Sequence, residues 1–185
     1  MSDTVFQSFQ NVRKVVDNSI KLLKDADALL AEKNYTPILG NGLATESSKS
    51  ILQSIDSYST LVPQYIARPY ALKSQLATGL VDHLYVINIQ FTHPSHQNLE
   101  PTIVAGRFSF EKPTENIRNT FKPWFTKHAI FEIDLNFNLN SEEEYVCEPF
   151  SDCTDTLQFH IAPLTSIKTS SDIAKLLEKI YQLSL

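Results

Sequence analysis

The chain has 185 residues, of which 42% are hydrophobic and 20% are charged, and its formal net charge at pH 7 is −5. This composition is typical of a globular protein, and the length predicts a single domain over residues 1–185. The 16 basic residues are scattered, which disfavours a nucleic-acid partner because phosphate binding usually needs a basic stripe. The sequence predicts no membrane helix and no signal peptide. With two cysteines only, it indicates a soluble, cytoplasmic protein.

The N-terminal part, residues 1–60, is predicted to be helical, and its first helix has the clearest pattern. Apolar residues recur at alternating spacings of four and three, which predicts one helix of about 28 residues. Two interpretations follow. The helix packs along its own sheet, or it forms a homodimer through Phe9, Val16 and Leu23. The residues of this heptad seam are Val5, Phe9, Val12, Val16, Ser19, Leu23, Ala26 and Leu30.

The segment after the first helix contains the residues that break regular structure. Pro37 cannot continue the helix, and Gly40-Asn41-Gly42 marks a turn with positive φ. Residues Thr45–Tyr58 are predicted to form a second helix, because their apolar side chains share one face. Prolines then indicate an irregular, partly buried crossing over Leu61–Leu72.

From residue 81 onward the hydrophobic pattern has a period of two, which predicts strands over residues 81–163. One face of each strand is expected in the core, and the other face, which includes Asn88 and Gln90, is expected to meet water or a polar partner. The cleanest alternation predicts core positions at Phe131, Ile133, Leu135 and Phe137. The predicted strands are Val81–Phe91, Thr102–Phe110, Ala129–Leu139 and Thr156–Ala162, with a short strand at Tyr145–Cys147.

Two further helices complete the prediction, one over Pro113–Lys127 and a C-terminal one over residues 170–184. The sequence thus predicts an α+β fold: an antiparallel sheet of four or five strands with a long N-terminal helix, a second helix and a C-terminal helix. In outline, this order of elements resembles the profilin-like and GAF-like layouts. It also resembles the small acidic type III secretion chaperones, which are dimers. Both resemblances lie in the order of elements alone, so no family is assigned.

No catalytic residue and no cofactor are predicted, because no catalytic or cofactor motif stands out. His93 and His96 are weak candidates for metal ligands, but Cys147 and Cys153 lie too far apart for the usual zinc spacing. We therefore expect no metal site. Glu132 and Asp134 share a predicted strand face, as carboxylates in acid–base catalysis or magnesium binding do. Asparagines continue that face, which is also typical of a merely solvated strand.

The candidate ligand- or partner-binding residues are Arg68, Tyr70 and Trp124, which lie in two aromatic–proline clusters. Such residues often anchor partners, although they also close the ends of cores. The sequence therefore favours a non-enzymatic binding or adaptor module that binds a protein partner or a small ligand. One alternative is a small metal-dependent hydrolase that uses His93, His96, Glu132 or Asp134. The other is a secretion-type chaperone that holds a partner in extended form.

Overall fold

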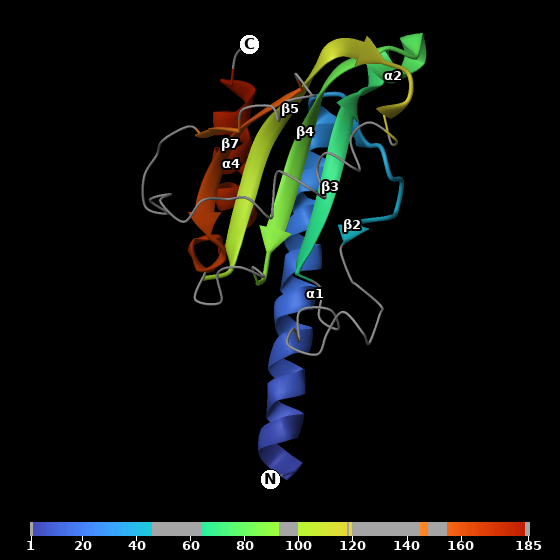
Figure 1. Cartoon of the computed structure of the whole chain (residues 1–185). Helices are drawn as coiled ribbons and strands as arrows, with labels where there is room; N and C mark the ends of the chain where they lie inside the picture. The colour runs from blue at the N-terminus through green and yellow to red at the C-terminus, as the bar shows by residue number, and fades with distance from the viewer. Residues whose placement is uncertain are drawn as a thin grey trace.

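A computed structural model describes residues 2–45, 64–92, 100–117, 119, 145–147 and 155–183. A long N-terminal helix, an antiparallel sheet and a C-terminal helix confirm the predicted α+β class (Figure 1). The elements are α1 (Ser2–Glu32), β1 (Tyr35–Pro37), β2 (Ala44–Thr45), β3 (Tyr65–Leu72), α2 (Lys73–Thr78), β4 (Val81–Gln90), β5 (Thr102–Thr114), β6 (Tyr145–Cys147), β7 (Thr156–Pro163), a 3-10 turn (Leu164–Ser166) and α4 (Ser170–Tyr181).

The strands form one antiparallel sheet in the order β1-β3-β4-β5-β7-β6. The short strands β1 and β2 both pair with β3, β1 at its C-terminal end and β2 near its N-terminal end. Gly106 of β5 lies opposite Phe159 of β7, and a Cβ at this position would approach the carbonyl oxygen of Gln158 to 2.5 Å. A side chain there would therefore force the two strands apart, which explains the glycine.

Both faces of the sheet are buried. On one face, apolar residues of β3, β4 and β5 pack under α1 and α4, including Tyr70, Ile87 and Ile103. On the opposite face, Leu84, Val86 and Phe108 belong to a second apolar cluster, which also contains these further buried residues: Tyr65, Ala67, Ala71, Val81, Val104, Phe110, Leu157, Phe159 and Ile161.

Asn88 and Gln90 also lie on that opposite face and are only 1% exposed each, so of the two expectations for this face, water or a polar partner, contact with water is wrong. They bond to each other, from Asn88 Nδ2 to Gln90 Oε1 at 3.2 Å, and Gln90 Nε2 donates to the carbonyl of Thr92 at 2.7 Å. Period-two alternation identifies the two faces of a strand, but it does not tell whether the polar face is covered.

The residues Leu61–Leu72 were expected to form an irregular crossing, but Tyr65–Leu72 is the strand β3, and seven of its eight residues are buried. Pro69 fits because the N–H and C=O of one strand residue point to the same side. Its carbonyl accepts from Ile38 N–H at 3.1 Å, on the side away from β4. A backbone N–H at residue 69 would therefore also point away from β4. For this reason, the proline removes no hydrogen bond between β3 and β4.

Two predicted helices do not begin where the sequence placed them. Thr45 belongs to β2, and the rest of the predicted helix Thr45–Tyr58 lies outside the described residues. Pro113 belongs to β5, which runs to Thr114. Most of the remaining Pro113–Lys127 segment lies outside the described residues, as does all of Ala129–Leu139 with its four predicted core positions. The strands β4, β5, β6 and β7 and the helices α1 and α4 are confirmed.

Helix α1 reaches well beyond the sheet. Its C-terminal half crosses one face of the sheet beside α4, and its N-terminal half projects past the end of the strands (Figure 1). Within the described part of the chain, no helix has the length and apolarity needed to cross a membrane.

Candidate functional site

The heptad seam of α1 is divided into a covered and an uncovered part. Ser19, Leu23, Ala26 and Leu30 are at most 3% exposed, and the three apolar residues among them belong to the core cluster formed by the sheet, α1 and α4. The seam residues before them are exposed, with Val5, Phe9 and Val12 all more than half accessible, while Val16 at the boundary is half-buried. Phe6 and Val15, which flank the seam, are exposed too. The projecting half of α1 therefore presents a contiguous apolar surface.

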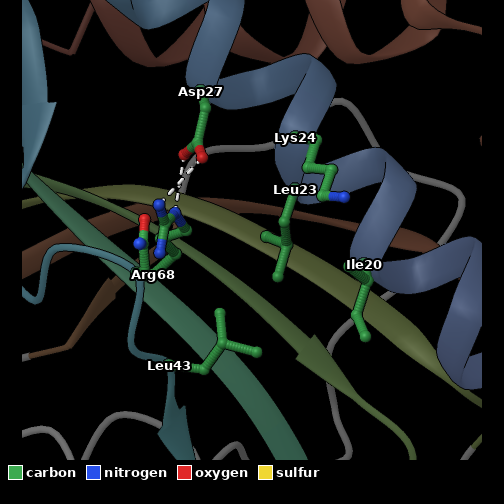
Figure 2. Close-up of a pocket in the computed structure, with 7 residues that line it drawn as sticks. Ile20, Leu23, Lys24, Asp27, Leu43 and Arg68 are labelled. Carbon is green, nitrogen blue, oxygen red and sulfur yellow. Dashed lines mark hydrogen bonds and ion pairs between the residues drawn. The ribbon is translucent and has the colours of Figure 1, made fainter.

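A groove of about 350 Å³ adjoins this surface, between α1 and the edge of the sheet (Figure 2). Ile20 and Leu23 of α1 form one apolar wall, and Leu43, just before β2, faces them. Ile20 is 36% exposed, so it links the groove to the projecting surface. The polar lining residues are Lys24, Asp27, Asn41 and Arg68.

An ion pair between Arg68 of β3 and Asp27 of α1 forms the end of the groove. Arg68 Nε and Nη2 donate to the two carboxylate oxygens of Asp27 at 2.6 and 2.8 Å, and Nη1 donates to the carbonyl of Gly42 at 2.9 Å. Burial opposes the charge on Arg68, but the Asp27 carboxylate outweighs it, so the pKa of Arg68 is raised. This bidentate pair fixes the position of α1 on the sheet.

The structure treats the sequence-predicted site residues differently. Arg68 lines the groove, whereas Tyr70 is fully buried in the core under α1. Burial raises the pKa of Tyr70, and the nearby Asp27 carboxylate raises it further. Tyr70 therefore packs in the core and presents no surface to a partner in this structure. The candidates Trp124, His93, His96, Glu132 and Asp134 lie outside the described residues.

A second polar cluster, which the sequence reasoning did not find, lies where β1, α2 and β4 meet. Tyr35 Oη and His83 Nε2 are 3.0 Å apart, and His83 Nδ1 contacts the Asp82 carboxylate. Gln75 Nε2 donates to the same carboxylate at 2.6 Å. Adjacent residues such as Asp82 and His83 normally point to opposite faces of a strand. A register shift between Val81 and His83 brings these two together, and no sequence signal marks it.

This cluster is better suited to holding elements together than to nucleophilic chemistry. Burial raises the pKa of Tyr35, and the neighbouring Tyr85 raises it further, so the phenol stays protonated at neutral pH. Although burial opposes it, bonds from Gln75 and His83 lower the pKa of Asp82. The carboxylate beside Nδ1 favours the tautomer in which His83 Nε2 accepts the Tyr35 hydroxyl proton. Tyr35 therefore ties β1 to β4.

The described residues contain no group of three or more His, Cys, Asp or Glu side chains that could hold a metal ion. His93, His96, Glu132 and Asp134 fall outside the residues to which that statement applies. A metal site that uses them stays a sequence-based alternative.

The comparisons with known proteins identify no relative. The chain matches no protein-family model, no curated protein and no solved structure. Any function is therefore inferred from the site itself.

Proposed function

We propose that the protein is a non-enzymatic binding module that self-associates through the projecting half of α1. One observation carries this proposal: the heptad seam continues with the same spacing past the end of the sheet that covers its second half. The side chains of this seam are buried at Leu23 and Leu30 and exposed at Phe9 and Val12.

A second apolar surface would remove this exposed stripe from water. Val5, Phe6, Phe9, Val12 and Val15 are each between 44% and 66% exposed. A contiguous apolar patch with a polar rim is typical of protein-interaction sites. Apolar residues repeated with heptad spacing are the surface that a second helix covers best, because its side chains fit between those of the first. A second copy of this chain carries a matching stripe.

The test is the molar mass of the purified chain over a range of concentrations, measured by sedimentation velocity and light scattering. We expect a reversible monomer–dimer equilibrium. Phe9→Asp should shift it to monomer, because a charge would have to be buried in the interface. Asn11→Asp is the matched control: it adds the same charge two residues from Phe9, at an exposed position off the seam, and should leave the equilibrium nearly unchanged. A wild-type chain that stays monomeric at high concentration would contradict the proposal.

The alternatives remain predictions of the sequence. A small metal-dependent hydrolase rests on His93, His96, Glu132 and Asp134, which lie outside the described residues. A secretion-type chaperone would also display an apolar surface, but it would bind an extended chain of another protein. A monomer that captures such a partner through Phe9 would favour that alternative over self-association.

A further inference from the structure

We propose that two copies pair their α1 helices in antiparallel orientation, so that Phe6 and Phe9 of each copy enter the groove of the other. This inference rests on the self-association proposed above and adds its orientation and register. It joins two features that are separate in one chain: an exposed aromatic pair without cover and an apolar groove with cationic groups at its rim.

One flank of α1 connects these two features. Its residues follow one another at spacings of three or four, so they lie on the same side of the helix. The C-terminal end of this flank, Ile20 and Lys24, lines the groove. Its N-terminal end holds Phe6 and Phe9, which are 64% and 66% exposed. The flank consists of Phe6, Phe9, Arg13, Asp17, Ile20 and Lys24.

The order of residues along the flank is self-complementary. If a twofold axis crosses α1 beside residue 15, antiparallel pairing places Phe6 opposite Lys24 of the second copy. Phe9 then lies one position from Ile20 of the second copy, at the entrance of the groove. A twofold interface makes every such contact twice. The projecting half of each helix would thereby lie against the body of the other molecule.

The charges favour this orientation over the parallel one. In antiparallel register, Arg13 lies opposite Asp17 of the second copy, and symmetry forms this pair twice. In a parallel pair at equal heights, Arg13 would face Arg13 and Asp17 would face Asp17, which repel. Asp17 already lies 2.6 Å from Lys21 of its own helix, so a second basic group would extend an exposed network. Lys24 of the groove also suits an aromatic ring, because an ammonium group is attracted to its face.

The groove suits an aromatic anchor. Its volume of about 350 Å³ lies in the range of sites that bury small molecules, and its apolar walls are Ile20, Leu23 and Leu43. The Arg68–Asp27 pair at its end is already satisfied by its own bonds. An incoming apolar side chain therefore does not strip either group of its partner.

Disulfide trapping tests the orientation, in full-length chains in which Cys147 and Cys153 are replaced by serine. A tagged Phe6→Cys chain is mixed with an untagged Lys24→Cys chain and oxidised gently. We expect a cross-linked heterodimer. Phe6→Cys alone should not cross-link to itself, because in the antiparallel pair the two residues 6 lie about 27 Å apart along the helices. Gln7→Cys mixed with Lys24→Cys is the control, since residue 7 points away from the flank.

The outcomes separate this inference from the proposed function. A monomeric wild-type chain overturns both. A dimer in which Phe6→Cys cross-links to itself overturns the antiparallel register and leaves self-association standing.

A charge exchange keeps the inference testable if Phe6→Cys weakens the dimer. Arg13→Asp and Asp17→Arg should each raise the dimer Kd about tenfold, and the double variant should restore it. A double variant as weak as the single ones would overturn the register.

Discussion

The two halves of α1 carry one heptad seam and differ in what covers it. The C-terminal half lies on the sheet beside α4, with Leu23 and Leu30 in the core. The N-terminal half carries Phe9 and Val12 into solvent. The two interpretations of the seam that the sequence left open are therefore not exclusive. Packing on the chain's own sheet accounts for the second half, and self-association is proposed for the first.

The side chains along the seam reflect this difference. Every second seam position holds Val5, Val12, Ser19 and Ala26 in turn. The two small residues are in the half that lies on the sheet, where a short side chain lets a helix approach closely. The Ser19 hydroxyl donates to the carbonyl of Val15 at 2.8 Å, so its burial costs no hydrogen bond. The valines occupy the half that has room for the side chains of another helix.

The largest expected difference between the halves concerns stability. Leu30→Ala removes a fully buried side chain and should lower the free energy of unfolding by about 2–5 kcal/mol. Phe9→Ala, on the exposed half, should change it by less than about 0.5 kcal/mol where the chain is monomeric. Denaturant unfolding of both variants at low protein concentration measures this. Equal losses would mean that the projecting half is also covered within one chain.

A smaller effect is expected from the ion pair that fixes α1 on the sheet. Asp27→Asn leaves the Arg68 guanidinium, 9% exposed, without its counter-charge. Because Asp27 itself is 29% exposed, we expect a loss of about 2 kcal/mol, below the range for fully buried pairs. Asp17→Asn is the control at a protein concentration where the chain is monomeric, since the Asp17–Lys21 pair is exposed and should contribute less than about 0.5 kcal/mol there. Thermal and chemical unfolding of both variants show whether the Arg68–Asp27 pair stabilises the fold by this amount.

Much of the fold was predictable because local patterns determine it. Period-two alternation located β4, β5 and β7, and heptad spacing located α1. Strand β3 was missed because Pro69 normally disfavours a strand, and only the pairing of β3 shows that its N–H is not needed. The starts of the predicted helices at Thr45 and Pro113 were wrong for the same reason: strand pairing overrode local propensity.

The candidate site was less predictable, because it depends on contacts between distant residues. Arg68 stood out in the sequence, but its partner Asp27 is 41 residues away, and nothing local connects them. Tyr70 was chosen as a partner anchor for its residue type, yet its place on β3 puts it in the core. The division of the seam depends on where the sheet ends relative to α1. That boundary follows from the tertiary structure, although Ser19 and Ala26 hint at it.

The smallest effect concerns α4, which packs beside α1 over the covered half. Asp172 completes the capping box of α4: its Oδ2 accepts from the backbone N–H groups of Lys168 and Thr169 at 3.1 and 3.0 Å. These bonds lower the pKa of Asp172 below its usual 3.8. A carboxyl group whose pKa is lowered by folding stabilises the fold at pH values above its usual pKa. This stabilisation is lost as the pH falls through the folded-state pKa.

Wild type should therefore be more stable than Asp172→Asn at pH 5, and the difference should shrink as the pH falls below about 3.8. Because the Asp172 carboxylate is exposed, the loss of stability caused by Asp172→Asn should be smaller than the loss caused by Asp27→Asn. Urea unfolding of both proteins between pH 5 and pH 3 measures it, and comparison with the variant cancels the titration of the other carboxylates. A difference that stays constant with pH would mean that the charge of Asp172 is not what caps α4.

If weakening α4 also exposes Leu23 and Leu30, hydrogen exchange should rise in the C-terminal half of α1 and stay unchanged in the projecting half, which α4 does not cover.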